Sequence, residues 1–573
     1  REAAVRTAFD LSYRALPAAA RSLFRRLGVL PGPDFSAAVA AVPAAVAEAE
    51  ADRLLRVLAR AHLVEPAATG RYRCHDLLRL FAVERLAADE PAEQDAVRHR
   101  LFDFYRHAVD SVARLAYPQM LRLPGDVARD PVFADVNEAL AWLDAELPGV
   151  LALVARTAEH GPHRVAWTLA DSLRGYFWLR RTANDWLTVA TAALRAAEAD
   201  DDPFATAAAH LSIADVHWTV GRHAEATDGY RRTVDLARRT GWTAAEATGL
   251  ANLAGVRVER GELDLAGEHY LEALDRYRGL GHKAAQGVTL SNLGNVYWEL
   301  GELARAAEYF ADALVLHDDL GAVAPRANTL LNLGSVQHDL GRFTDAAATL
   351  SAAIDLCRRV GDRADEATAM LHLAGVHRDV GRRADALDLA RSALDLAVDI
   401  EARRIEAQAT NTIGSIRQRL GAPAAALEHH RRALDLAAST DDRRGETEAL
   451  IGTAAAMLDL DRLTEAGHAA ERARTAARRQ GYRLLTGRAL LTLGAVRLRT
   501  GGTAVAVEHT AHALYVFRSA GARLDEGRAR QQYGTCLAAV GDPAGARDEW
   551  RAALDLFTEI GAPEAGEVGR LLA

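Results

Sequence analysis

Residues 281–320 read GHKAAQGVTLSNLGNVYWELGELARAAEYFADALVLHDDL, and their pattern of small residues recurs along most of the chain. Gly294 lies seven residues before Gly301, Ala306 lies five residues after it, and Ala313 lies twelve residues after it. The same slots return every forty residues without a gap, nine times between residues 201 and 573. The glycine slot holds Gly221, Gly261, Gly301, Gly341, Gly381, Gly421, Gly501 and Gly541, with Asp461 at the remaining position. A fixed period of this kind indicates a repeat architecture.

The repeat predicts two helices per unit. A second glycine recurs about twenty residues after the first, as at Gly321, and a residue that can adopt the left-handed conformation ends a helix. Two such ends per forty residues predict helices of about 15–18 residues. Small residues at fixed slots allow antiparallel helices to approach closely, and larger residues such as Leu293 and Leu314 fill the space beside them. One hairpin cannot bury its own apolar side, so neighbouring hairpins must stack.

This spacing of small residues resembles the tetratricopeptide repeat. The usual period of that repeat is about 34 residues, and the unit here is six residues longer, as in the long-helix repeats of kinesin light chains. The predicted fold is therefore all-α: a tetratricopeptide-type α-solenoid of about nine 40-residue helical hairpins over residues 201–573, preceded by a small winged-helix domain and a helical arm. A generic helical solenoid without a peptide groove is the alternative.

Composition excludes several classes of protein. The chain has 573 residues, of which 50% are hydrophobic, 26% charged and 6% aromatic, as is typical of a folded helical protein. Its net charge of −9 argues against broad nonspecific affinity for DNA. Cys74, Cys357 and Cys536 are too far apart for a disulfide framework or a paired metal motif, so we expect a cytoplasmic location. No apolar run approaches the length of a membrane span.

Residues 1–200 do not share the forty-residue phase. Residues 1–90 predict three helices, the second near 36–48 and the third over 51–64, with the only strands near 62–75; this is a winged-helix outline. Residues 91–200 predict a helical arm that ends in a degenerate repeat, with Trp186 in the alanine slot. Within the arm, 117–133 is expected to be irregular and 134–161 to form two helical pieces parted at Pro148.

Three short motifs carry a more specific resemblance. They are SYRALP at 12–17, LGVLPG at 27–32 and RYRCHDLLR at 71–79, and AWL at 141–143 followed by Glu146 adds to them. Together they resemble the winged helix and helical arm of actinobacterial STAND regulators, which are NB-ARC-type signalling NTPases similar to antibiotic-pathway activators. The resemblance implies ATP or ADP and Mg²⁺ bound by an NTPase domain upstream of Arg1, so we expect the chain to be a fragment. The only lysine, Lys283, lacks the spacing of a phosphate-binding loop, so no enzyme activity or cofactor is expected in this chain itself.

His75 is the candidate nucleotide-sensing residue. His75 and Asp76 stand where that family has its "MHD"-like motif, whose histidine reaches the phosphates of bound ADP and holds the inactive state. The alternative is a histidine beside a helix that begins at Leu77, for which Asp76 would be the better N-cap. The pairs His429–His430 and His317–Asp318 lack ligands from a second element, so no metal site or catalytic residue is predicted.

Asparagines on the first helices are the candidate peptide-binding residues. They are Asn252, Asn292 and Asn332 in one slot, with Asn295 and Asn328 nearby. A carboxamide can donate and accept hydrogen bonds together, as an extended peptide backbone requires. The alternative is that they link neighbouring helices. The whole concave stripe is expected to be polar and mixed, without dense arginine or lysine, and it adds Asp215, Ser335, Ser415, Trp298 and Glu299.

The expected function is the sensor half of an NTP-controlled regulatory switch, acting in transcriptional regulation. A protein or peptide bound on the concave surface would relieve inhibition that the winged helix imposes on the chain's own NTPase domain. We expect no membrane partner, and DNA only through a further effector domain. The alternatives are a free-standing interaction scaffold and the sensor part of an effector enzyme, such as a defence protein, whose chemistry lies in a missing N-terminal portion.

Overall fold

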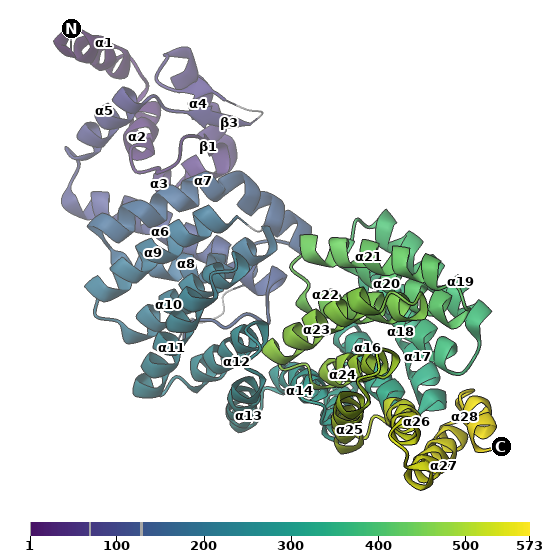
Figure 1. Cartoon of the computed structure of the whole chain (residues 1–573). Coiled ribbons are helices and arrows are strands. Elements are labelled where there is room, and N and C mark those ends of the chain that lie inside the picture. The colour runs from purple at the N-terminus through teal and green to yellow at the C-terminus, as the bar shows by residue number, and fades with distance from the viewer. Residues whose placement is uncertain (1, 68–69, 126–129, 181) are drawn as a thin grey trace. The chain divides into compact units, whose positions relative to one another are not determined.

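The computed structural model describes residues 2–67, 70–125, 130–180 and 182–573, and in these residues it contains 28 helices and three short strands (Figure 1). The predicted all-α fold is confirmed. The chain forms two compact units, Arg1–Gly249 and Leu250–Ala573, which are described separately below. No helix in the described ranges combines the length and the apolar character that crossing a bilayer requires.

The first unit begins with a small helical bundle and a sheet and continues into long paired helices. Its helices are α1 (Glu2–Arg14), α2 (Ala18–Leu27), α3 (Ala37–Ala44), α4 (Glu48–Arg60), α5 (Asp76–Leu86), α6 (Pro91–Ala116), α7 (Val136–His160), α8 (His163–Arg180), α9 (Ala183–Ala199), α10 (Pro203–Thr219) and α11 (His223–Thr240). One continuous hydrophobic core runs from Tyr13 to Ala245. Trp186, in the alanine slot of the degenerate repeat, is buried in it and donates a hydrogen bond to Ser212.

The sheet contains β1 (Phe35–Ser36), β2 (Glu65–Pro66) and β3 (Arg71–Arg73) in the order β1-β3-β2. The predicted hairpin is confirmed by the antiparallel pairing of β2 with β3, and positions 68–69 of its turn lie outside the described residues. The expectation that 62–75 holds the only strands is wrong, because β1 pairs Phe35 with Tyr72. β1 is too short to show an alternating pattern, and Ser36 also caps α3 by accepting a hydrogen bond from the Val39 amide.

The prediction of two helical pieces parted at Pro148 is wrong, because α7 is one helix with Pro148 inside it. An interior proline costs a helix about 3 kcal/mol. Here the residues that follow it are held by packing, since Val150 and Leu153 are fully buried and the Tyr105 hydroxyl lies against Gly149. The connection before α7 is irregular in its described residues, as predicted, and 126–129 lie outside them.

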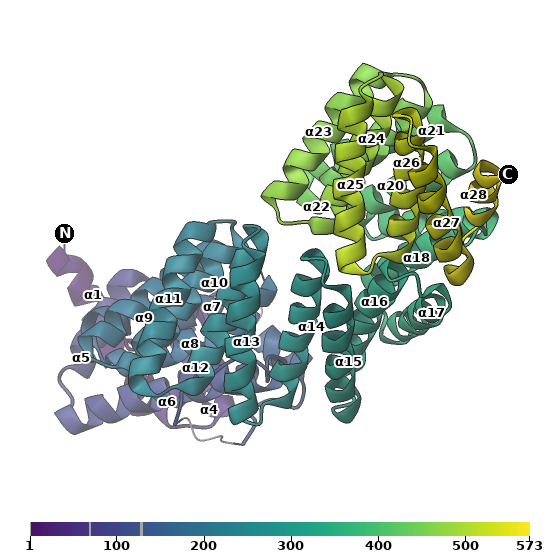
Figure 2. The same cartoon turned by 60° about the horizontal axis from the view of Figure 1, so that its bottom comes forward.

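The second unit is built of stacked helical hairpins (Figure 2). Its helices are α13 (Leu263–Gly279), α14 (Lys283–Glu299), α15 (Leu303–Asp319), α16 (Val323–Asp339), α17 (Phe343–Val360), α18 (Arg363–Asp379), α19 (Arg383–Asp399), α20 (Arg403–Arg419), α21 (Pro423–Ser439), α22 (Arg443–Asp459), α23 (Leu463–Arg479), α24 (Arg483–Arg499), α25 (Thr503–Ala520), α26 (Arg523–Ala539), α27 (Pro543–Ile560) and α28 (Ala565–Leu572). The helix α12 (Thr243–Glu259) contains the boundary between the units.

The slots of the repeat act as the sequence predicts. All nine alanines five residues after the helix-ending slot, including Ala306 and Ala346, are fully buried. The helices of the hairpins from α13 to α27 have 17 or 18 residues. Gly301 ends α14 with φ 73°, and Asp461 takes φ 62° in the same slot. The left-handed residue is therefore a requirement of the turn itself.

Glycine in the slot seven residues before the helix end makes room for a large side chain on the paired helix. A Cβ atom at Gly294 would lie 2.6 Å from Cε1 of Phe310, which is fully buried. We expect Gly294→Ala to lower the free energy of unfolding by about 1–3 kcal/mol through overpacking. Gly279→Ala is the matched control, because a Cβ there meets nothing within 4 Å and alanine favours a helix. Urea unfolding of both variants tests this, and equal stability would contradict the slot assignment.

Candidate functional site

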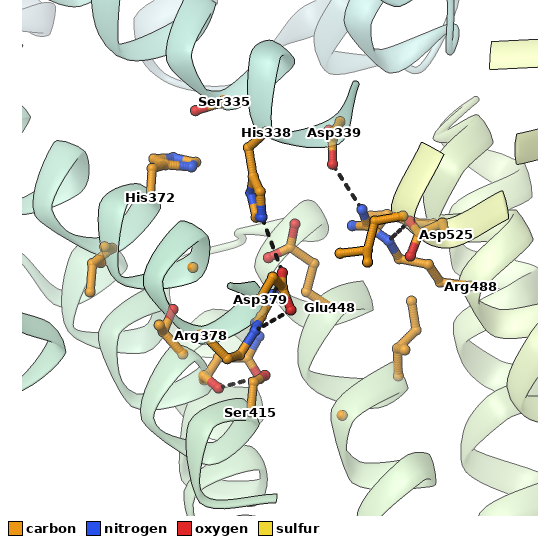
Figure 3. A pocket seen from close by; sticks show the side chains of 18 of the residues that line it. Ser335, His338, Asp339, His372, Arg378, Asp379, Ser415, Glu448, Arg488 and Asp525 are labelled. Atoms are coloured by element: carbon orange, nitrogen blue, oxygen red, sulfur yellow. Dashed lines mark hydrogen bonds and ion pairs between the residues drawn. The ribbon is translucent and has the colours of Figure 1, made fainter. Parts of the chain in front are cut away.

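A cavity of about 930 Å³ lies within the second unit (Figure 3). The first helices of the hairpins, α14, α16, α18, α20, α22, α24 and α26, all contribute side chains to it. The cavity is thus the concave side of the solenoid. Its lining contains six arginines, and carboxylates face them from several hairpins.

Three ion pairs cross the cavity between distant hairpins. Arg444 pairs with Glu299, Arg488 Nη2 lies 2.9 Å from Asp339 Oδ1, and Arg528 Nη2 lies 2.9 Å from Asp379 Oδ1. The partners are 145, 149 and 149 residues apart. An acidic residue at the end of each of α14, α16 and α18 supplies one side, and α22, α24 and α26 supply the arginines. The pairs therefore close the solenoid on itself, and α16 contacts α26 directly.

Asp339 and Arg488 form the middle of this closure. Asp339 Oδ2 also accepts a hydrogen bond of 2.8 Å from the Trp298 indole, and Arg488 Nε donates to Asp525 at 2.7 Å. Burial alone would raise the pKa of Asp339, but the charges of Arg488 and Arg444, together with His338 and the Trp298 hydrogen bond, outweigh it and lower that pKa. Both groups are thus ionised at neutral pH.

The Asp379 carboxylate, in another part of the cavity wall, accepts from three donors. Its carboxylate pairs with Arg378 at 2.5 Å and with Arg528, and His338 Nε2 lies 3.0 Å away (Figure 3). Burial opposes ionisation, but the two guanidinium charges hold the pKa of Asp379 well below its usual range. His372 also lines the cavity, and burial lowers its pKa to about 4, so its imidazole is neutral at pH 7.

The structure brings some of the predicted peptide-binding residues together. Asn295 and Asn332 line the cavity, as do Trp298, Glu299 and the predicted stripe serines Ser335 and Ser415. Asn328 instead donates to Asp365 of the next hairpin at 3.0 Å and accepts from Asn332, which is the helix-linking role.

The other candidates lie elsewhere. Asn292, on α14, is not among the described residues that line the cavity, and neither is Asn252, on α12. Asp215 belongs to the first unit, where it is buried and accepts a hydrogen bond from Tyr230 at 2.9 Å. The concave stripe therefore does not run through every repeat as a row of amides.

The expectation of a stripe without dense arginine is wrong. The lining arginines are Arg378, Arg383, Arg419, Arg444, Arg488 and Arg528. Single-repeat reasoning misses the ion pairs that Arg444, Arg488 and Arg528 make across the cavity, because those pairs form only when hairpins more than 140 residues apart come together. The one available signal was the recurrence of Glu299, Asp339 and Asp379 in the same slot.

His75 lies in the first unit, at the start of α5. This helix begins at Asp76 rather than at Leu77, and His75 is its N-cap, with Nδ1 accepting the Leu77 amide at 3.4 Å. The imidazole is otherwise exposed, and a neutral ring that accepts through Nδ1 carries its proton on Nε2. The nucleotide-sensing role of His75 stays a prediction.

The sequence is similar to known repeat proteins and regulators. The tetratricopeptide repeat family matches residues 245–316 and 325–397. The regulatory protein AfsR of Streptomyces griseus is 34% identical over 245 residues, and that of Streptomyces coelicolor is 32% identical over 248 residues. Each match covers 41% of this chain and 24% of the relative, so the chain corresponds to about a quarter of those proteins' length.

Several solved structures match the chain at low sequence identity. A STAND protein with a tetratricopeptide repeat sensor from Pyrococcus horikoshii covers 85% of this chain and 61% of its own, with 14% identity and a TM-score of 0.38. The quorum sensor NprR from B. thuringiensis covers 66% and 99%, with 16% identity and a TM-score of 0.46. A Rap protein complexed with competence and sporulation factor covers 62% and 98%, with 13% identity and a TM-score of 0.48.

Proposed function

We propose that this chain is the sensor region of an AfsR-like regulator, and that it binds an extended peptide, free or part of a protein, in the concave cavity of its second unit. The observation that carries the proposal is the 930 Å³ cavity, which lies within the range of ligand-binding sites. Similarity to two regulatory proteins at 32–34% identity supports the regulatory role.

The lining suits a peptide better than it suits other ligands. Asn295 and Asn332 offer carboxamides that can donate to and accept from a backbone, and the Trp298 ring offers an apolar contact beside them. A nucleic acid would need an excess of cations, whereas here the arginines face carboxylates such as Asp339 and Asp379. Among the described residues, no three His, Cys, Asp or Glu side chains are arranged to hold a metal ion.

The signal would pass to a nucleotide-binding domain in the longer protein. In this proposal the helices and sheet of residues 1–90 act as the winged helix, and His75 is the residue that contacts the nucleotide. Its capping bond to Leu77 uses Nδ1 and leaves Nε2–H available as a donor to a phosphate oxygen. ATP or ADP and Mg²⁺ would be bound by that domain and not by this chain.

Filling the cavity should abolish peptide binding. Ala455 lines the cavity on α22, so we expect Ala455→Trp to reduce capture of a synthetic pool of free decapeptides by at least about tenfold, since every 1.4 kcal/mol is tenfold in affinity. Ala438→Trp, at an exposed position of α21, is the matched control. Affinity selection with mass-spectrometric detection measures the bound peptides, and thermal melts confirm folding.

A second variant tests the amides. Asn295→Ala with Asn332→Ala should weaken the selected peptides by about 5- to 150-fold, because each lost neutral hydrogen bond contributes about 0.5–1.5 kcal/mol. If folded Ala455→Trp captures the same peptides as the Ala438→Trp control, the cavity is not the binding site. If the unmodified chain captures none, the peptide proposal is wrong.

A further inference from the structure

One end of the cavity carries more cationic than anionic buried groups. Arg378 at the end of α18, Arg419 at the end of α20 and Arg528 on α26 converge there on two buried carboxylates, Asp379 and Glu564. Arg528 bonds both carboxylates, at 2.9 Å and 2.8 Å, and Arg419 Nη2 lies 3.1 Å from Glu564. The side chains of those two carboxylates are only 2% and 6% exposed. Arg528 also lies 3.7 Å from Asp525, a carboxylate that Arg488 shares. Three guanidinium groups therefore share two carboxylates and part of a third.

A fourth arginine adds to this excess. Arg383, at the start of α19, lines the same cavity, and its Nε is buried with no hydrogen-bond partner. In the described ranges it has no ion pair either, although arginine donors are normally satisfied when buried. The other buried or half-buried carboxylates of the lining, Glu299, Asp339, Glu448 and Asp525, pair with Arg444 and Arg488, and Asp525 also lies near Arg528. Asp459 and Glu567 line the cavity as well, but both are exposed. Solvated charges of this kind are strongly screened, so they offset the buried excess only in part.

Arg419 shows the effect of the excess. Repulsion by Arg528, together with burial, lowers the pKa of Arg419 to about 10, even though Glu564 acts in the opposite direction. When neighbouring charges destabilise the charged form of an arginine, an anion that binds beside it stabilises that form. Its side chain is 35% exposed, so it is accessible from the cavity.

We propose that this arginine cluster, defined as Arg378, Arg383, Arg419 and Arg528, binds a carboxylate of the peptide ligand. The inference rests on the proposed function and adds the chemistry of one ligand group. A carboxylate accepts two parallel hydrogen bonds from a guanidinium, which gives both affinity and orientation. The single negative charge of a carboxylate matches the excess of positive charge in the cluster, which the exposed Asp459 and Glu567 reduce. A phosphate group, in contrast, carries a charge of about −1.5 to −2.

Arg419→Gln tests the cluster without removing a support of the fold. Arg528 still neutralises Glu564 in this variant, and a source of repulsion is lost, so the melting temperature should stay unchanged or rise. Peptides selected on the unmodified chain should bind the variant about 10- to 100-fold more weakly, as expected for loss of a charge-assisted hydrogen bond. Arg417→Gln, two residues earlier on α20 and not part of the cavity lining, is the control and should bind normally.

Two peptide series identify the source of the carboxylate. Amidation of the C-terminus should reproduce the 10- to 100-fold loss if the terminal carboxylate is bound, and Asp→Asn or Glu→Gln changes should do so if a side chain is bound. In either case the modified peptide should no longer distinguish Arg419→Gln from the unmodified chain. If selected peptides bind but neither series nor Arg419→Gln weakens them, the carboxylate proposal is wrong while the peptide proposal stands. If no peptide is selected, both proposals fail.

Discussion

Asp379→Asn should be among the most destabilising conservative changes in the chain, lowering the free energy of unfolding by about 3–5 kcal/mol. The carboxylate is 2% exposed and accepts from Arg378, Arg528 and His338 at once. Asparagine keeps the volume but leaves Arg378 without a counter-charge and takes one of the carboxylates from Arg528. It also turns an amide NH2, which is a donor, toward the donors that the carboxylate accepted from. The loss should be visible in urea unfolding followed by circular dichroism.

The control for this change is Asp548→Asn. Asp548 also pairs with an arginine, Arg551, but the two side chains are 76% and 66% exposed. Exposed pairs contribute about 0–1 kcal/mol, so this variant should resemble the unmodified chain. Adding Arg528→Gln to Asp379→Asn should recover part of the loss, because contacting residues are not additive. If Asp379→Asn proved as mild as its control, the ion pairs across the cavity would not hold the solenoid closed.

The difference between contacts within one hairpin and ion pairs between distant hairpins explains which parts of the structure the sequence could predict. Contacts within one hairpin repeat every forty residues, so the fully buried Ala306 and Ala346 could be assigned from spacing alone. The helix-ending residue could be assigned in the same way, because even Asp461 must adopt the left-handed conformation there. These features are local, and each follows from the geometry of two antiparallel helices.

The cavity lining could be predicted only in part. Asn295 and Asn332 line the cavity, but Asn292, which shares the slot of Asn332, does not, so the slot alone does not decide which residues line it. The arginine contacts could not be predicted, because they depend on the curvature accumulated over about four repeats, and small rotations per repeat decide it. The helix break predicted at Pro148 is wrong for a related reason. Helix propensity favours a break at a proline, but the tertiary packing of α7 overrides it.

Acid should destabilise the second unit well above the pH at which its carboxylates titrate. His430 on α21 is fully buried, its Nδ1 lies 2.7 Å from Asn411 Oδ1, and its Nε2 has no partner. Burial lowers the pKa of His430 to about 4, whereas an unfolded histidine titrates near 6.5. Between these values the unfolded state binds a proton that the folded state does not. Stability is therefore complete above about pH 6.5 and falls as pH drops toward 4.

His430→Leu should remove this dependence. In another hairpin of the repeat, Leu350 occupies the same slot and packs against Gly334, as His430 packs against Gly414, so leucine fits the site. The shift of His430 corresponds to roughly 3 kcal/mol between pH 7 and pH 4, and the variant should lose that much less stability over this range. Urea unfolding at pH 8 and at pH 4.5 measures the difference, with the pH 8 value reporting any packing cost alone. If variant and unmodified chain lose stability equally on acidification, His430 is not the group that takes up the proton, and the half-buried His372 in the cavity wall, whose pKa is also lowered to about 4, becomes the one to substitute.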